Sequence, residues 1–305
     1  MMLHIACTVD EKYLRPLLAM MSSFCEHHRG GEVTLHLFCE ELEPEAKARL
    51  DRFLGDRHVV HRHYPLRRDQ FSDMRVCYPH FSKANYYRLL IPERLSGTDR
   101  VLYLDVDILI RKSLAPLFHT PLDNQPVAAA PDAYPPGDCA RLGIPEHLGY
   151  FNSGVLLMDL PRWRSEGIAE QAIDYVRRHH GDPVKCLYSD QDALNMTLLK
   201  RWKPVSETWN FNIFHCRQFP QTLTEARRQC LRNGPAVIHY THREKPWMRH
   251  CALPFQREYL RNAARNGIRF PFHLTPRNTW IWITRLYALH RVRLPYHLAG
   301  IPWNP

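Results

Sequence analysis

The sequence predicts an α/β fold with a Rossmann-like, mostly parallel sheet flanked by helices, and two observations predict it. Short apolar runs of strand length alternate with longer segments that repeat apolar residues at helical spacing. Chains that alternate strand and helix in this way build parallel sheets covered by helices. Polar clusters follow several of the apolar runs, and ligands bind such sheets at the carboxyl ends of the strands.

The expected elements follow one another in a regular order. Apolar runs predict the strands 3–8, 33–39, 58–63, the run 101–104 that ends at Asp105, 127–130, 154–158 and 237–240. Apolar faces predict the helices 13–27, 43–54, 83–90, 169–179 and 191–199. Ser189-Asp190 is a suitable N-cap pair for the last helix, and the Pro/Gly-rich segment 134–138 predicts a loop.

Composition narrows the class of protein. With 305 residues, 45% of them apolar and 24% charged, the chain can bury one large core, which argues against disorder and a coiled coil. No run approaches the roughly 18 apolar residues of a spanning helix, and the N-terminus leaves no room for a cleavable secretory signal. Nine cysteines without any CxxC pair argue against a disulfide framework and a zinc site. We therefore expect a cytoplasmic protein with reduced thiols.

Charge is unevenly distributed along the chain. Residues 251–305 contain eight arginines, no lysine and one acid, Glu258, so this segment carries +7 of the net charge of +10. No other shift in composition occurs before residue 250. We expect one catalytic domain, 1–250, followed by a basic aromatic C-terminal tail, 251–305.

Two carboxylates stand just past a buried strand, in Asp105-Val106-Asp107. Residues i and i+2 of an extended segment share one side, so both carboxylates can converge on one ion. Hard oxygen ligands suit magnesium or manganese. The alternative is an ordinary turn or helix cap, which the same pattern also forms.

Two later residues extend this pattern. His239 ends the strand that begins at Val237 and could add a nitrogen ligand, giving a mixed site that prefers manganese to calcium. Lys245, before Pro246, offers a cation at a fixed kink that suits a diphosphate. Taken alone, His239 could be a satisfied strand-end histidine and Lys245 a solvated loop residue.

Taken together, four motifs resemble those of family 8 retaining glycosyltransferases. The resemblance covers residues 3–250, is strongest to the bacterial lipopolysaccharide galactosyl- and glucosyltransferases, and is more distant to glycogenin. The motifs are Leu102-Tyr103-Leu104-Asp105-Val106-Asp107, Phe151-Asn152-Ser153-Gly154-Val155-Leu156-Leu157, Asp190-Gln191-Asp192-Ala193-Leu194-Asn195 and His239-Tyr240 with Lys245-Pro246-Trp247.

The resemblance implies a GT-A fold, a UDP-sugar donor, Mn²⁺ with Mg²⁺ as the alternative, and transfer with retention. It also implies roles for individual residues. Asp105, Asp107 and His239 would hold the ion, and Lys245 would contact the phosphates. Asp10 and Tyr13 would bind the uracil. Arg88, Asp190 and Gln191 would lie at the donor sugar, and Asp132 and Asn152 would line the sugar and acceptor region. Without the resemblance, Tyr13 is a core helix residue, Arg88 a surface ion pair, Asp190 a helix cap, and Asp132 and Asn152 turn residues.

The resemblance also bears on the mechanism. Gln191 matches the side chain nearest the anomeric carbon, and an amide is a poor nucleophile. A front-side attack is therefore favoured, in which the departing phosphate takes the acceptor's proton, and Asp190 is the alternative covalent nucleophile. Lys12 and His242 depart from the family's usual Asn and Gly, which bears on the identity of the donor.

The C-terminal tail mixes arginines with Trp280, Trp282, Tyr287 and Trp303. This mixture predicts a segment at the cytoplasmic face of a membrane, since aromatic rings and arginines favour the headgroup region. A helix docked on the domain is the alternative, and the mixture also suits single-stranded nucleic acid.

The expected function is transfer of galactose or glucose from a UDP-sugar to a saccharide, the lipopolysaccharide core or a lipooligosaccharide. A self-glucosylating enzyme of the glycogenin type and a catalytically silent nucleotide-sugar-binding protein are the alternatives. A nucleic-acid-binding protein is disfavoured, because the excess charge is confined to the tail and no recognition motif accompanies it.

Overall fold

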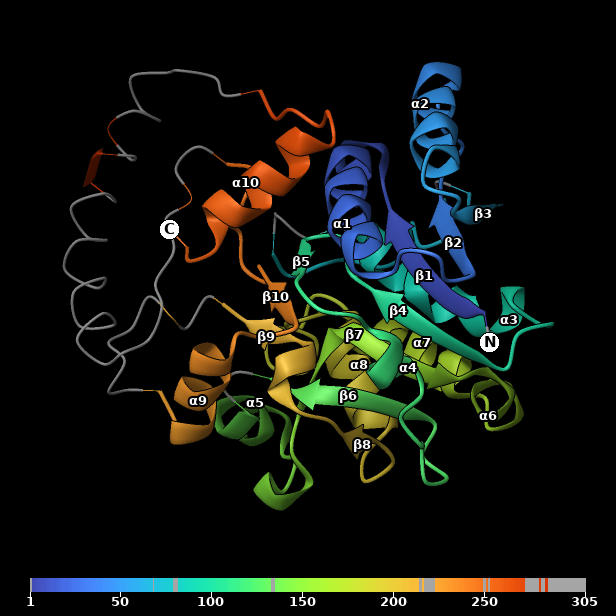
Figure 1. Ribbon diagram of the computed structural model, residues 1–305. Coiled ribbons are helices and arrows are strands. Elements are labelled where there is room, and N and C mark those ends of the chain that lie inside the picture. The colour runs from blue at the N-terminus through green and yellow to red at the C-terminus, as the bar shows by residue number, and fades with distance from the viewer. Residues whose placement is uncertain are drawn as a thin grey trace. The chain divides into compact units, whose positions relative to one another are not determined.

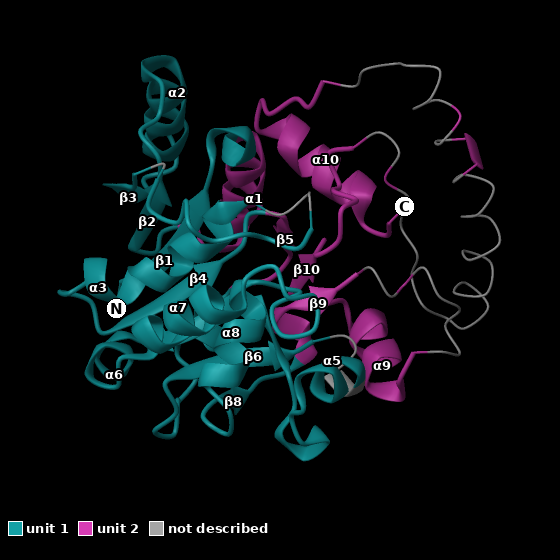
Figure 2. Cartoon of the chain, turned by 180° about the vertical axis from the view of Figure 1, so that it is seen from behind, with its two compact units in different colours: residues 1–14, 30–106, 114–206 teal, residues 15–29, 107–113, 207–305 magenta. Residues whose placement is uncertain are grey.

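The computed structural model describes residues 2–67, 69–78, 82–132, 135–213, 216, 223–248, 251, 253–271, 280 and 283–284. The chain folds into two compact units, each built from separate stretches of sequence (Figure 2). The first comprises residues 1–14, 30–106 and 114–206, and the second comprises residues 15–29, 107–113 and 207–305. The expected division at residue 250 stays a prediction.

Seven strands form the main sheet of the first unit, in the order β3-β2-β1-β4-β7-β6-β8 (Figure 1). Their bounds are β1 Leu3–Val9, β2 Val33–Cys39, β3 Val60–Pro65, β4 Arg100–Leu104, β6 Val127–Pro131, β7 Phe151–Asp159 and β8 Lys203–Pro204. β7 is antiparallel to its neighbours β4 and β6, and the other neighbouring pairs are parallel. The predicted mostly parallel sheet is confirmed.

Strand direction determines which residues meet at one edge. β1, β4 and β6 run the same way, so their carboxyl ends lie at one edge together with the amino end of the antiparallel β7. Asp10, Asp105 and Asp132 follow the three parallel strands, and Asn152 lies at the start of β7. The polar clusters therefore stand at the edge where such sheets bind ligands.

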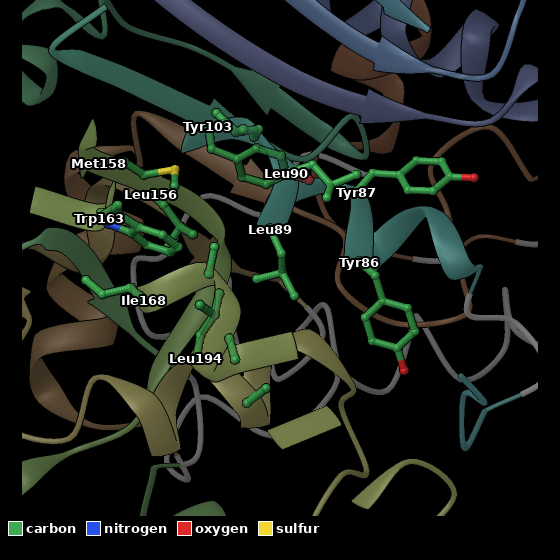
Figure 3. Close-up of a cluster of buried hydrophobic side chains, with 14 of the residues drawn as sticks. Tyr86, Tyr87, Leu89, Leu90, Tyr103, Leu156, Met158, Trp163, Ile168 and Leu194 are labelled. Atoms are coloured by element: carbon green, nitrogen blue, oxygen red, sulfur yellow. The ribbon is translucent and has the colours of Figure 1, made fainter. Parts of the chain in front are cut away.

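Helices flank this sheet. Those of the first unit are α2 Pro44–Gly55, α3 Ile91–Arg94, α4 Ala115–Phe118, α5 Pro135–Leu142, α6 Leu160–Ser165, α7 Ile168–His179 and α8 Asp190–Thr197, with the 3₁₀ helices η1 Glu11–Tyr13, η2 Lys83–Leu90 and η3 Glu146–Leu148. η2 contributes Tyr86, Leu89 and Leu90 to a buried cluster that also contains Tyr103 of β4 and Leu194 of α8 (Figure 3). This packing anchors η2, and with it Arg88, against the strands that carry the site.

The second unit contains a sheet of three short strands, β5 Ile108–Ile110, β9 Phe211–Asn212 and β10 Val237–His239. β10 is antiparallel to β5 and pairs His239 with Ile108. The helices of this unit are α1 Leu14–His27, α9 Glu225–Asn233, α10 Gln256–Arg265 and the 3₁₀ helix η4 Glu207–Trp209. In α10, Tyr259 and Asn262 are buried, and Asn262 accepts a hydrogen bond from Ser22 of α1.

Several expected boundaries are wrong. The third strand begins at Val60 rather than 58, because the turn that ends α2 continues through His58, which has a left-handed φ of 55°. Residues 135–138 of the expected loop 134–138 are helical, since α5 begins at Pro135, and residue 134 lies outside the described residues. A proline is tolerated in the first turn of a helix, where its missing N–H would have no partner within the helix. Ser189 precedes α8 but makes no side-chain cap hydrogen bond.

Candidate active site

Arg88 is the centre of the polar cluster in the first unit. Its guanidinium donates to Asp105 Oδ1 at 3.0 Å, to the Ser153 carbonyl at 2.6 Å and to the Ser153 hydroxyl at 3.1 Å, and its Nε lies 3.1 Å from Asp190 Oδ2. Only 4% of Arg88 is exposed. The alternative interpretation of Arg88 as a surface ion pair is therefore wrong, because the residue forms a buried bridge between Asp105, which follows β4, and Asp190 at the start of α8.

A second buried side chain orients Asp105. The Tyr103 hydroxyl donates to Asp105 Oδ1 at 2.6 Å and lies 3.0 Å from the Thr8 hydroxyl of β1. Burial raises the pKa of Tyr103 well above its ordinary value, so the hydroxyl keeps its proton. The Asp105 backbone N–H also donates to the Gly154 carbonyl of β7 at 2.8 Å. Asp105 is thus held by three strands of the sheet.

Asp190 is a buried carboxylate beside Arg88. Burial raises its pKa to about 6, and the positive charge of Arg88 opposes this rise without cancelling it. The Ser153 hydroxyl donates to the same oxygen at 3.2 Å. At neutral pH, Asp190 is therefore ionised, but in the folded protein it binds a proton more readily than an exposed aspartate does.

We expect Asp190→Asn to stabilise the metal-free protein at pH 8 by up to about 3 kcal/mol. Because the folded-state pKa is raised, the folded protein binds more protons than the unfolded chain between pH 6 and the unperturbed value of 3.8. The wild type therefore gains stability as pH falls through 6, and the advantage of the variant should vanish near pH 4. Urea unfolding at several pH values measures this difference, and lower stability of the variant at pH 8 would contradict it.

An exposed carboxylate provides the control for this measurement. Asp174 lies on α7 with 65% of its side chain exposed. Asp174→Asn should change the stability by less than about 0.5 kcal/mol at either pH. A pH-dependent gain shared by both variants would mean that the effect does not come from burial of Asp190.

Gln191 lies in a closed set of hydrogen bonds. Its side-chain nitrogen donates to Asp132 Oδ2 at 2.7 Å and to the Tyr150 hydroxyl at 3.2 Å. Its oxygen accepts from the Ser153 backbone N–H at 3.0 Å. Asn152 also donates to Asp132 Oδ2, at 3.2 Å. The residues expected to line the sugar are therefore joined to one another and to the Arg88 cluster through Ser153.

The second unit carries a separate charged cluster around Asp107. Its Oδ2 accepts from Lys245 Nζ at 2.5 Å, and its Oδ1 lies 3.2 Å from His239 Nε2. The pairing of β5 with β10 brings Asp107 to His239, and the Tyr240 N–H donates to the Asp107 carbonyl at 3.0 Å. Burial favours a higher pKa for Asp107, but the charges of Lys245 and His239 outweigh it and hold the pKa well below its usual range.

A further residue orients the histidine. His239 Nδ1 lies 2.8 Å from Asn210 Oδ1, which can accept a proton from it, and this contact fixes the plane of the ring with Nε2 facing Asp107. Metal-binding histidines usually have such a second hydrogen bond on their other ring nitrogen. Asp105, Asp107 and His239 each offer a ligand atom that could hold a metal ion. Two carboxylate oxygens and an imidazole nitrogen suit manganese or magnesium.

Asp10 and Tyr13 lie directly after β1. Asp10 Oδ1 accepts a hydrogen bond from the Tyr13 backbone N–H at 3.2 Å and so caps η1. Tyr13 is half-buried, and Lys12 beside it is exposed. The alternative interpretation of Tyr13 as a core helix residue is wrong, because the residue lies in the short 3₁₀ turn that precedes α1.

The site also contains residues that sequence reasoning missed. Tyr103 and Ser153 lie inside the motifs that carry the resemblance, and a polar side chain within a buried strand was the signal that could have found them. Tyr150 directly precedes β7, where the same signal was weaker. Asn210 gave no signal, because an asparagine in a turn is ordinary.

Comparison with known proteins identifies the family of this chain. A family model described as Glycosyl transferase family 8 matches residues 4–251. The chain belongs to glycosyltransferase family 8. Family membership confirms the resemblance stated from the sequence and supports glycosyltransferase activity.

Individual relatives of this family 8 chain cover most of its length. General stress protein A of Bacillus subtilis (strain 168) is 28% identical over 265 residues, which cover 85% of this chain and 92% of that protein. The lipopolysaccharide 1,2-glucosyltransferase of Escherichia coli (strain K12) is 26% identical over 261 residues, 84% of this chain and 76% of that protein. A crystal structure of the galactosyltransferase LgtC with donor and acceptor sugar analogues covers 93% of this chain and 100% of that chain, with a TM-score of 0.75 and 26% identity. The GT-A type fold is thereby confirmed.

Proposed function

We propose that this protein is a retaining hexosyltransferase that moves galactose or glucose from a UDP-sugar to the lipopolysaccharide core or a lipooligosaccharide. The observation that carries the proposal is the joined set of Arg88, Asp190 and Gln191 at the sheet edge where Asp105 follows β4. The names of two relatives support the substrate class, one a lipopolysaccharide 1,2-glucosyltransferase and one a galactosyltransferase.

Asp105, Asp107 and His239 are the residues that would hold a divalent cation, and their donor set fits manganese or magnesium. When bound, such an ion would neutralise charge that develops on the departing diphosphate. Lys245 adds a positive charge that is already paired with Asp107, and we propose that it turns to the phosphates when the donor binds. Asp10 and Tyr13 would bind the uracil, by accepting the ring N–H and by stacking.

The hydrogen bonds of Gln191 bear on the mechanism. Its nitrogen faces the Asp132 carboxylate, its oxygen faces the Ser153 N–H, and an amide is a poor nucleophile. We therefore favour a front-side reaction. The acceptor hydroxyl bonds to the anomeric carbon as the bond to UDP breaks, and its proton passes to the departing phosphate oxygen. Asp190 is the alternative covalent nucleophile, but Arg88 and Ser153 engage its Oδ2.

The proposal is tested by incubating the protein with manganese and a panel of UDP- and GDP-sugars and measuring nucleotide release without acceptor. Release from UDP-galactose or UDP-glucose that chelator abolishes is the expected result. UDP binding without release from any donor would instead identify a silent nucleotide-sugar-binding protein. Release from a GDP-sugar alone would contradict the proposed donor.

We also propose that the C-terminal tail places the enzyme at the cytoplasmic face of a membrane. Among the described residues, no helix has the length and apolar character needed to cross a bilayer. Trp280 and Ile283 are 69% and 51% exposed, and most of 277–305 lies outside the described residues. Exposed aromatic and aliphatic side chains beside arginines favour the membrane interface.

Deleting residues 277–305 should therefore release the protein from anionic phosphatidylglycerol vesicles, as measured by co-sedimentation. Neutral phosphatidylcholine vesicles provide the control, because they lack the charge that arginines bind. Vesicle binding that the deletion leaves unchanged would contradict the proposal.

A further inference from the structure

The first unit contains an ion pair between Arg141 and Asp192 that is linked to Gln191 by hydrogen bonds through Tyr150. Arg141 of α5 donates to both oxygens of Asp192, at 2.6 Å to Oδ1 and 3.0 Å to Oδ2. Asp192 is fully buried, and its Oδ2 also accepts from the Tyr188 backbone N–H at 2.9 Å. A paired, ionised carboxylate accepts hydrogen bonds and has none to donate. Every neighbour of Asp192 in this set must therefore donate to it.

Tyr150 connects this pair to Gln191. Its hydroxyl is fully buried and lies 2.5 Å from Asp192 Oδ1. Burial, and next the charge of Asp192, raise the pKa of Tyr150 well above its ordinary value, so the hydroxyl keeps its proton. Because that single proton is given to Asp192, the Tyr150 oxygen can only accept from its other neighbour, the Gln191 side chain.

This polarity selects one orientation of the Gln191 amide. The nitrogen faces two acceptors, the Tyr150 hydroxyl and Asp132, and the oxygen faces the Ser153 N–H. A flipped amide would place its oxygen against the Asp132 carboxylate and its NH₂ against the Ser153 N–H, leaving buried groups without partners. The backbone is held as well, since Asn195 donates to the Gln191 carbonyl at 2.9 Å.

We infer that Arg141, Asp192 and Tyr150 are positioning residues that hold the Gln191 amide with its oxygen toward Ser153 and its nitrogen toward Asp132. The inference rests on the proposed function, in which Gln191 lies at the reacting sugar carbon. It assigns Asp192 and Tyr150 a part in the reaction that they perform through Gln191.

The test is a double-mutant cycle on nucleotide release, measured with the UDP-sugar that the donor panel selects. Tyr150→Phe retains the ring and removes only the hydroxyl. We expect kcat to fall about tenfold, which corresponds to the free energy that one hydrogen bond contributes. The KM for the donor should change less than about twofold. In a Gln191→Ala background, the same change should lower kcat by less than about twofold, because the group that Tyr150 orients is gone.

A matched tyrosine controls for loss of a hydroxyl in general. Tyr175 of α7 donates to the Lys185 carbonyl at 2.8 Å. Tyr175→Phe should leave kcat unchanged. If Tyr150→Phe lowers kcat by the same factor with and without Gln191, the hydroxyl acts on the structure rather than through Gln191, and the inference is overturned.

A spectroscopic measurement tests this inference independently of the proposed function, because it does not require activity. In ¹⁵N spectra, the side-chain amide signal that disappears in Gln191→Ala should shift in Tyr150→Phe and stay in place in Tyr175→Phe. A signal that Tyr150→Phe does not move overturns the inference even if the protein proves inactive. A shifted signal in a protein that releases no nucleotide would support the positioning of Gln191 while contradicting the proposed transfer.

Discussion

Replacing Asp107 with Asn should lower manganese-dependent nucleotide release by at least about a hundredfold, since loss of an outer-shell partner alone typically reduces metal affinity or activity ten- to a hundredfold. Asp107 is both an expected ligand of the ion and the ion-pair partner of Lys245. Its carboxylate lies 3.2 Å from His239 Nε2 and 2.5 Å from Lys245 Nζ. An amide keeps the size of the side chain but removes the negative charge that both the ion and Lys245 need. Donor kcat/KM at increasing manganese concentration measures the loss.

A second readout does not depend on activity. Manganese should raise the melting temperature of the wild type, because a ligand that binds only the folded state stabilises it, and this shift should be lost in Asp107→Asn. Glu258, which pairs with Arg111 at 2.8 Å in the same unit, supplies the control. Glu258→Gln should retain both the activity and the manganese shift. Equal shifts in wild type and Asp107→Asn would contradict the assignment of Asp107 as a ligand.

Replacing Arg88 with Met should destabilise the protein by about 3 to 5 kcal/mol at pH 8, the usual effect of leaving a buried charge without its partner. Methionine retains much of the packing of the arginine stem. It leaves Asp105 and Asp190 without their shared guanidinium and the Ser153 carbonyl without its donor. Urea unfolding measures the change in free energy.

The loss should be smaller at pH 5 than at pH 8. Arg88 opposes the effect of burial on Asp190, so its removal should raise the pKa of Asp190 above the present value of about 6. Folding of the variant is then coupled to proton uptake, and its stability should rise as pH falls. A loss independent of pH would contradict this account of Asp190.

An exposed arginine provides the matched control. Arg177 of α7 lies 3.5 Å from Asp73, with more than half of each side chain exposed. Exposed pairs of this kind contribute about 0 to 1 kcal/mol. Arg177→Met should therefore leave the free energy of unfolding within about 1 kcal/mol of the wild-type value. A loss as large as that of Arg88→Met would show that burial of Arg88 does not explain the effect.

How far the sequence could predict this site depended on how local each signal was. Apolar runs marked the buried strands, and Asp105 was predicted past the end of one of them because strand and carboxylate are neighbours in sequence. Boundaries failed where a local turn was ambiguous, as at His58 and at Pro135. Propensities at such positions are nearly balanced, and tertiary contacts decide between them.

The sequence by itself determined the α/β class and, through four ordered motifs, the family. These features depend on residues close together in the chain. Only the tertiary structure decided that Arg88 bridges Asp105 and Asp190, and that Tyr150 sets the direction of the hydrogen bond to Gln191. These contacts join residues far apart in sequence, and their strength comes from burial, which no local pattern specifies.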